Sequence, residues 1–290
     1  MSHTTKLPRK RGAWFFVVSE GQQVPLAFTN LVTTDGVSRR VVRLAGGCKG
    51  ISPELQAALK DYFVDAFRLV DESGATTHEF NGTVFSGGTA NFDEKGDLKG
   101  LMITNVPGYL AEAYPCIAIS TTPRTADMSL DPGNGSVIVD NYGGKMDHRQ
   151  HGNLVVQKNP GEVLNWDGDL EVYLTLMEGW QNVGFKVAIV AMNGGDVTRD
   201  EIYQALKRSI PVIVVEGSLR EADAFVKAFN SGDFSDTAAE LRKKNAAAAD
   251  AAVATCKGVL ESIDRSLVSI VKIGDARGLR EALFARGLLG

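Results

Sequence analysis

Along this chain, short apolar runs alternate with segments whose apolar side chains recur every three or four residues. The runs are rich in β-branched and aromatic residues, as strands are, and they lie at 13–18, 41–44, 83–86, 116–120, 153–157, 187–191, 210–218 and 267–273. Helical spacing predicts helices at 170–180, 199–208 and 276–289. This alternation predicts an α/β fold: a Rossmann-like doubly wound, mostly parallel sheet with helices on both faces.

The first predicted helix of the sheet region has the clearest local signals. Ser52 and Pro53 supply an N-cap and a proline in the first turn. Leu55, Leu59 and Phe63 then recur at a spacing of four, so one stripe of this helix is expected to pack on the sheet.

The composition divides the chain into three parts. Residues 1–38 are an N-terminal arm, in which the extended pieces 13–18 and 25–28 are candidates for a hairpin. Residues 39–233 carry the strand and helix pattern and form the predicted binding domain. Residues 234–290 begin with an alanine-rich and charged segment that fits one long amphipathic helix, followed by a strand and a helix. We expect this last part to pack on the domain or to form a homo-oligomer with a second subunit.

Two further segments are less regular. A helical tendency at 98–109 is cut at Pro107-Gly108, which predicts a short helix or a turn. Residues 121–152 are rich in Pro, Gly, Asp, Asn and Thr, with only the apolar island 137–139. This composition predicts a long loop, and long ordered loops often carry function.

Composition and charge argue against several classes of protein. The 290 residues carry a formal net charge of -4, which gives no footprint for nonspecific nucleic-acid binding. No apolar run is long enough to cross a bilayer, and the basic start lacks the apolar core of a secretion signal, so we expect a cytoplasmic protein with no membrane partner. Cys48, Cys116 and Cys256 form no CxxC pair, which argues against a disulfide framework or a metal site. We expect no cofactor.

Three predicted strands end at a pair of glycines. The pairs are Gly46-Gly47, Gly87-Gly88, which Thr89 follows, and Gly194-Gly195. Because the carboxyl ends of parallel strands converge on one crevice, backbone N–H groups of such turns can hold an anionic ligand. The alternative is that they are sharp turns without a ligand, since glycine also ends strands for conformational reasons.

The third turn has further candidate chemistry. Thr198 can donate a hydroxyl at the start of a helix, and Glu201, one turn later, can reach a ribose hydroxyl. The alternative is a capping role for Asp196, Thr198 and Glu201, with the last two forming a capping box. Capping and binding are compatible, and we expect both.

The segment 193–201, NGGDVTRDE, resembles the PGGxGTxxE signature of the Lonely guy phosphoribohydrolases and of the broader SLOG superfamily. Asn193 stands in place of the proline and Val197 in place of a glycine. The stretch 210–223 resembles a segment of the N-terminal cytosolic region of melastatin-type TRP channels, and 44–47, 85–89, 153–156 and 267–271 are similar to other pieces in the same order. The resemblance covers about residues 40–289 and implies a free-standing relative of that region.

The resemblance implies a bound nucleotide derivative: ADP-ribose in some channels, and nucleoside monophosphates in the phosphoribohydrolases. The matching phosphate and ribose positions are Gly87, Gly88, Thr89, Gly194, Gly195 and Thr198, with the neighbouring loop Glu216, Gly217 and Ser218. The helix 171–178 departs from the pattern because it lacks the arginine that ADP-ribose-binding members place there.

Two functions from different classes follow. The first is a sensor that binds a nucleotide-derived small molecule in the crevice. The second is an N-glycosidic hydrolase, in which Glu201 would act with an arginine; the nearest candidate is Arg149, which is far upstream of the expected spacing and fits a solvated loop residue equally well. A purely structural scaffold that assembles through the helix after residue 233 is a third alternative.

Other polar and aromatic residues lie in or near the predicted long loop. His148 and His151 lie close together in the sequence with Asp147, a combination that could ligate a metal ion. Because no further ligand follows at a useful spacing, we expect these to be polar loop residues. Trp166 and Tyr142 are candidates to stack on a base or to cover the core.

Overall fold

The computed structural model describes residues 14–91, 101–126, 128–131, 136–139, 144–147, 149–159 and 162–290. The predicted arm up to residue 12, His148 and Tyr142 lie outside the described residues, as does the side chain of Thr89.

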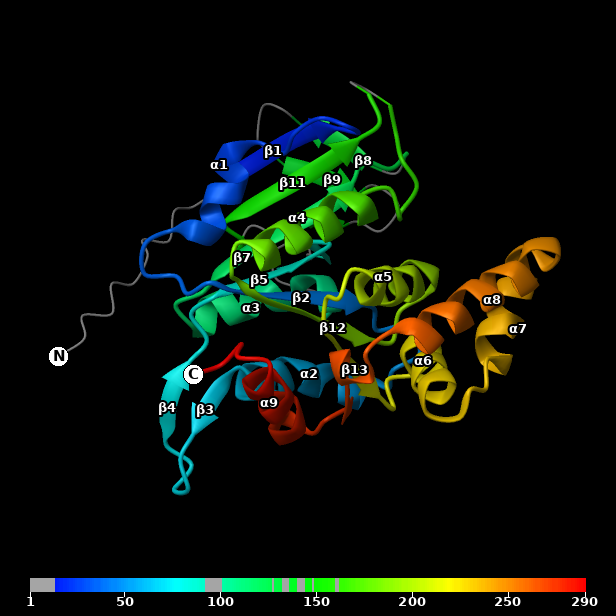
Figure 1. Cartoon of the computed structure of the whole chain (residues 1–290). Helices are drawn as coiled ribbons and strands as arrows, with labels where there is room; N and C mark the ends of the chain where they lie inside the picture. The colour runs from blue at the N-terminus through cyan, green and yellow to red at the C-terminus, as the bar shows by residue number, and fades with distance from the viewer. Residues whose placement is uncertain are drawn as a thin grey trace.

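A parallel sheet of eight strands crosses the molecule (Figure 1). Its order is β1-β11-β7-β5-β2-β12-β13-β14, and every neighbouring pair is parallel. The strands are β1 (Trp14–Ser19), β2 (Arg40–Gly46), β5 (Thr83–Ser86), β7 (Ile117–Pro123), β11 (Gly152–Gln157), β12 (Lys186–Met192), β13 (Val212–Glu216) and β14 (Val268–Lys272). From β2 the chain builds outward through β5, β7 and β11, and then returns to place β12 on the other side of β2. The strand order therefore reverses between β2 and β12.

Helices cover both faces of this sheet, and each face has its own buried cluster. One cluster includes residues of α1 (Leu26–Thr29), α4 (Leu170–Asn182), α5 (Asp196–Lys207), α6 (Arg220–Ser231) and α8 (Ala246–Ser262). The other includes residues of α2 (Pro53–Ala66), α3 (Val106–Ala113) and α9 (Ala276–Ala285). Figure 1 shows α4 and α5 on the side of the sheet opposite to α2 and α9. The predicted doubly wound α/β fold is confirmed.

Local signals fixed the start of α2 as expected. The Ser52 hydroxyl accepts a hydrogen bond from the Leu55 N–H at 3.2 Å, and Pro53 occupies the first turn. Leu59 and Phe63 are buried against the sheet. Short 3-10 helices, which the sequence pattern does not reveal, occur as η1 (Asn30–Thr33), η2 (Ile103–Asn105) and η4 (Arg265–Leu267).

The prediction of a long loop at 121–152 is wrong. β7 runs on to Pro123, and the following residues contribute to an antiparallel sheet of the order β6-β10-β9-β8. Its strands are β6 (Thr89–Asn91), β8 (Met128–Asp131), β9 (Ser136–Val139) and β10 (Gly144–Met146). These strands are three or four residues long, and turn-forming residues surround them, so local composition cannot distinguish them from a loop. A second hairpin, β3 (Arg68–Val70) with β4 (Thr76–Glu79), was also not predicted.

The N-terminal hairpin is not formed. β1 is an edge strand that pairs in parallel with β11, and the second piece is helical in α1. Pro107 and Gly108 do not end a helix, because α3 begins at Val106 and carries both residues in its first turn. A proline is tolerated there, since the N–H groups of the first turn have no partner within the helix.

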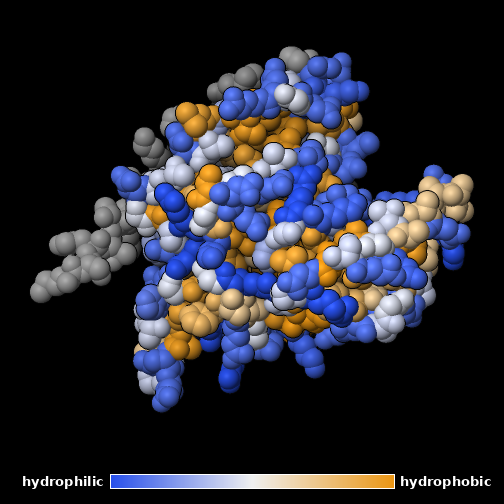
Figure 2. Space-filling model, in the orientation of Figure 1, coloured by the Kyte–Doolittle hydropathy of each residue, from blue (hydrophilic) through white to orange (hydrophobic). Residues whose placement is uncertain are grey.

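The predicted long helix after residue 233 is two helices, α7 (Ser235–Lys244) and α8, which pack on each other. The chain turns at Asn245, whose extended backbone ends α7 and whose side chain accepts the Ala248 N–H to cap α8. The division into three domains stays a prediction, although β1 and β14 are both strands of the one sheet. Figure 2 shows polar and apolar residues mixed over this face, with a pale apolar area toward the alanine-rich N-terminal end of α8. Among the described helices none is both long and apolar enough for a membrane span.

Candidate functional site

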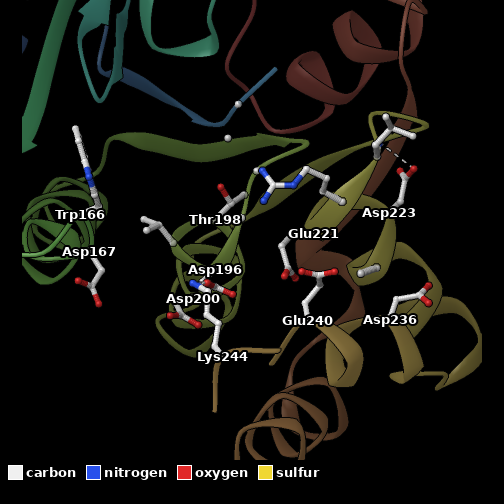
Figure 3. A pocket seen from close by; sticks show the side chains of 18 of the residues that line it. Trp166, Asp167, Asp196, Thr198, Asp200, Glu221, Asp223, Asp236, Glu240 and Lys244 are labelled. Carbon is white, nitrogen blue, oxygen red and sulfur yellow. Dashed lines mark hydrogen bonds and ion pairs between the residues drawn. The ribbon is translucent and has the colours of Figure 1, made fainter. Parts of the chain in front are cut away.

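A crevice of about 1040 Å³ opens at the carboxyl edge of the sheet, where the strand order reverses. Its floor is formed by Gly46 and Gly47 at the end of β2 and by Gly194 and Gly195 after β12. The walls are the loop 165–167, the first turns of α5 and α6, and one face of α7 (Figure 3). Ligands of open α/β sheets bind at such a reversal point. Two of the three predicted glycine turns therefore come together in one site.

Two of these glycines are required by close packing. Gly46 has a φ of 123°, and a Cβ there would overlap the carbonyl oxygen of Met192 in the neighbouring strand. Gly194 has a φ of 85°, and a Cβ there would overlap the side chain of Thr198. The absence of side chains lets the β2 and β12 turns approach each other and lets α5 start directly above them.

The first turn of α5 faces the crevice without a side-chain cap. Gly195 is the N-cap residue, and α5 begins at Asp196. The predicted capping box is therefore wrong, because Thr198 lies inside the helix and Glu201 turns to another partner. The Thr198 side chain lines the crevice and is only 5% exposed, and its hydroxyl has no hydrogen-bond partner among the described residues.

Glu201 does not line the crevice. It is 2% exposed and forms an ion pair with Arg43, a buried residue in the middle of β2. The Arg43 guanidinium lies 3.5 Å from the ring centroid of Tyr173, and its Nη1 donates to the Thr121 hydroxyl at 3.4 Å. Sequence reasoning missed Arg43; the available signal was a charged residue between apolar neighbours in a buried strand.

Asp169, which precedes α4, completes this buried cluster. Burial raises the pKa of Asp169 to about 7, an effect that the nearby Arg43 charge and a hydrogen bond from Thr121 oppose and that Glu201 reinforces. The charge of Arg43 thus acts on two buried carboxyl groups, of which Glu201 is ion-paired with it. Since a buried charge without a partner is costly, the cluster holds a proton on Asp169 below about pH 7.

Asn193 organises three loops below the crevice. It is fully buried, with a φ of 56°, and its N–H donates to the Ser218 hydroxyl at 2.7 Å. Its side-chain amide donates to the carbonyl oxygens of Ser218 at 2.6 Å and Lys49 at 3.0 Å, while its oxygen accepts the Gly194 N–H at 2.8 Å. The residue that replaces the signature proline therefore ties together the loops after β2, β12 and β13.

The loop after β13 supports the site and does not line it. The Ser218 hydroxyl donates to the Val215 carbonyl oxygen at 2.6 Å and is buried. The N–H groups of Gly217 and Leu219 donate to the carboxylate of Asp223, at 2.7 and 3.0 Å. Of the predicted ligand-binding positions, Glu216, Gly217 and Ser218 are not among the residues that border the crevice.

The second glycine turn is likewise separate. Gly87 accepts a hydrogen bond from the Thr122 hydroxyl at its carbonyl oxygen, and the Gly88 N–H donates to the Ser86 hydroxyl at 3.1 Å. The Gly88 carbonyl oxygen accepts the Asp147 N–H at 2.9 Å. Gly87 and Gly88 do not border the crevice, and Thr89 starts β6. The bond between Gly88 and Asp147, which follows β10, joins the large sheet to the small antiparallel sheet.

Arg149 lies away from Glu201, on the other face of the sheet. Its side chain donates to the Asp147 carboxylate at 2.6 Å and to the Asn105 carbonyl oxygen at 3.1 Å, and it lies 4.0 Å from the Tyr109 ring centroid on α3. Burial acts to lower the pKa of Arg149, but its contacts with Asp147 outweigh this and raise it. Arg149 anchors α3. Within the described residues no three potential metal-ligating side chains come together.

Charged residues that sequence reasoning passed over line the walls. Arg220, the first residue of α6, extends over Gly195, where a Cβ would lie 3.2 Å from its guanidinium, and it forms no hydrogen bond or ion pair with the described residues. Lys244 of α7 pairs with Asp196 of α5. The signal for Arg220 and its neighbour Glu221 was a charged pair in the turn that follows a buried strand.

An acidic set around one arginine forms the other side of the crevice. Arg199 is 7% exposed and contacts the carboxylates of Asp196 at 2.7 Å, Asp200 at 3.1 Å and Glu221 at 3.6 Å. Burial raises the pKa values of Asp200 and Glu221, and Arg199 opposes both shifts. Three carboxylates on one guanidinium leave this wall negative. Trp166, which is 40% exposed, forms part of the facing wall (Figure 3).

Residues 145–268 match a family model described as "SLOG in TRPM, prokaryote". The matched segment contains β12, α5, β13 and α6, the elements that border most of the crevice. The resemblance to the SLOG superfamily and to the cytosolic region of melastatin-type TRP channels is thus confirmed for this segment. Among curated proteins no significant match is found.

Two solved structures are similar to the chain at low sequence identity. TM1055, a structural genomics target, is 14% identical, and the alignment covers 85% of this chain and 99% of that chain with a TM-score of 0.42. The Moco carrier protein from Chlamydomonas reinhardtii is 13% identical, with coverage of 85% and 96% and a TM-score of 0.40. The fold class rests on the strand order of the chain itself.

Proposed function

We propose that this chain binds a phosphorylated, nucleotide-derived small molecule in the crevice between the turns after β2 and β12, and acts as a ligand sensor. One observation carries the proposal: the Arg220 guanidinium, which has no partner among the described residues, and the uncapped first turn of α5 face the same space above Gly195. A helix N-terminus supplies unpaired N–H groups and a positive dipole end, and an arginine adds charge and paired donors for a phosphate.

The Thr198 hydroxyl supports a phosphate at this end. It is enclosed by the crevice wall, and the described residues leave its hydrogen-bonding capacity unused. The volume of about 1040 Å³ is large enough for a nucleotide-sized ligand. The family match to residues 145–268 supports the same class of ligand.

The outer wall suggests how binding would be sensed. Lys244 of α7 pairs with Asp196 at the first position of α5, so one ion pair connects the end of α7 to the phosphate end of the crevice. A phosphate there would compete with the Asp196 carboxylate for Lys244. Binding would thereby change the contact between α5 and the α7–α8 pair. Assembly through these helices and a cytoplasmic location stay predictions.

The hydrolase alternative has less support. Glu201 is enclosed with Arg43 and does not border the crevice, and Arg149 contacts α3 on the opposite face. A general acid or base must come within hydrogen-bond distance of the reacting group. Glu201 would have to leave its buried ion pair first.

Thermal unfolding with AMP, NAD, ADP-ribose and inorganic phosphate tests the proposal, with chromatography of each mixture for released base or ribose 5-phosphate. At a concentration one hundred times Kd, a bound nucleotide is expected to raise Tm by about 5–10 °C without any product. Product formed with turnover would establish the hydrolase. A Tm unchanged by every phosphorylated probe, with no product formed, would rule out both functions.

A further inference from the structure

Glu221 is a buried carboxylate that borders the crevice and accepts no hydrogen bond from the described residues. It is 5% exposed, and its only ion pair among the described residues is the 3.6 Å contact with Arg199. Arg199 already donates hydrogen bonds to Asp196 and Asp200. No described residue donates a hydrogen bond to Glu221. A buried acceptor of this kind calls for a donor, and the open side is the crevice.

Glu240 of α7 faces Glu221 across this part of the crevice (Figure 3). Burial raises the pKa of Glu221; the charges of Arg199 and Arg220 oppose this shift, and the charge of Glu240 adds to it. Lys243 is the hydrogen-bonding partner of Glu240. Two carboxylates that face each other over a cavity are suited to a ligand that presents two donors.

Arg220 and Glu221 are successive residues that reach different parts of the same crevice. Arg220 extends to Gly195 and the start of α5, whereas Glu221 extends to Arg199 and the α7 wall. Thr198, whose enclosed hydroxyl also has no partner among the described residues, borders the crevice as well. A ligand held here would have an anion at one end and hydrogen-bond donors at the other.

We propose that Glu221, assisted by Glu240, accepts hydrogen bonds from the vicinal diol of a pentose ring whose phosphate lies at Arg220. This assignment rests on the proposed function and names the ligand class: pentose phosphates and nucleotides with a free 2′,3′-diol. A carboxylate is the group that commonly recognises a ribose diol at the reversal point of an α/β sheet. Glu221 takes the role that the sequence suggested for Glu201, which is paired with Arg43.

Isothermal titration of the full chain with ribose 5-phosphate and 2-deoxyribose 5-phosphate, and with AMP and 2′-deoxy-AMP, tests this inference. A hydrogen bond from a hydroxyl to a buried carboxylate predicts that the wild-type protein prefers each ribose compound by about 10- to 100-fold. Glu221→Gln is expected to weaken ribose binding until the preference is below about 3-fold, while the deoxy compounds keep their affinity. Glu261→Gln, at an exposed position of α8, is the matched control and should keep the wild-type preference.

The outcomes separate the two proposals. Binding of both phosphates with equal affinity by the wild-type protein overturns the diol assignment and leaves the phosphate site standing. A full preference retained in Glu221→Gln overturns the role of Glu221. If that variant does not fold, the substitution Glu240→Gln at an exposed residue replaces it as the test. It must reduce the preference for the ribose compounds, and an unchanged preference overturns the inference. No binding of any phosphorylated probe overturns the proposed function and this inference together.

Discussion

The carboxylate of Glu201 is held by the guanidinium of Arg43, and both side chains are buried between β2 and α5. This contact fixes the first turns of α5 against the centre of the sheet and so positions Thr198 and Gly195 at the crevice. It also accounts for a glutamate at this position without any catalytic role, because a buried arginine in β2 requires a partner.

Replacement of Arg43 by Met should strongly destabilise the fold. The change leaves Glu201 and Asp169 buried without a cation, and breaking a buried pair in this way costs about 3–5 kcal/mol. Urea unfolding measures the loss. The double variant Arg43→Met with Glu201→Leu should recover much of it, because no charge of the pair then remains. A single variant within about 1 kcal/mol of the parent would contradict this account.

The stability of the protein should fall as the pH rises from about 4 to about 7. Burial raises the pKa of Asp169 from its ordinary value of 3.8 to about 7, so the folded state retains a proton in this window that the unfolded state releases. The resulting loss of folding stability reaches its full size above pH 7. Asp169→Asn removes the titration, and it should be more stable than the parent at pH 8 by up to about 4 kcal/mol.

Urea unfolding at pH 5 and pH 8 measures this linkage. Asp167→Asn, at an exposed neighbour that borders the crevice, is the control and should keep the pH dependence of the parent. The assignment to Asp169 is wrong if Asp169→Asn shows the same decline between the two pH values as the parent.

Restoring the signature proline at residue 193 should disrupt the fold. Asn193 has a φ of 56°, whereas proline requires about -65°, and its N–H donates to Ser218. Asn193→Pro is expected to lose at least about 3 kcal/mol of stability. Glycine adopts this φ without strain, so Asn193→Gly loses only the hydrogen bonds of the side chain. A loss of about 1–3 kcal/mol of stability is expected. Thermal unfolding compares the two, and a proline variant as stable as the glycine variant would refute the argument.

Arg220→Ala should weaken phosphate binding without harming the fold. The side chain has no partner among the described residues, and therefore Tm without ligand should change by less than about 2 °C. The affinity for AMP should fall about 10- to 100-fold, as expected for loss of a charge-assisted hydrogen bond. Titration in low and high salt provides the check, since the parent should lose affinity with salt more steeply than the variant. Arg242→Ala, at an exposed residue of α7, is the control.

The sequence by itself determined the α/β fold, the start of α2 and the glycine turns after β2 and β12. These features have local causes: side-chain periodicity follows from strand and helix geometry, a serine before a proline caps a helix, and glycine allows close approach of two turns. Such signals depend only on residues near one another in the chain.

Only the tertiary structure decided which polar residues reach the crevice and which support it. Glu201 is paired with Arg43 of β2, Ser218 is bonded to Asn193, and the Gly87-Gly88 turn is bonded to Thr122, so none of them borders the crevice, whereas Glu221 does. The strands at 128–146 and the turn at Asn245 were decided in the same way. A buried polar group must find its partner wherever the sheet brings one, and partners from distant segments leave no pattern in the local sequence.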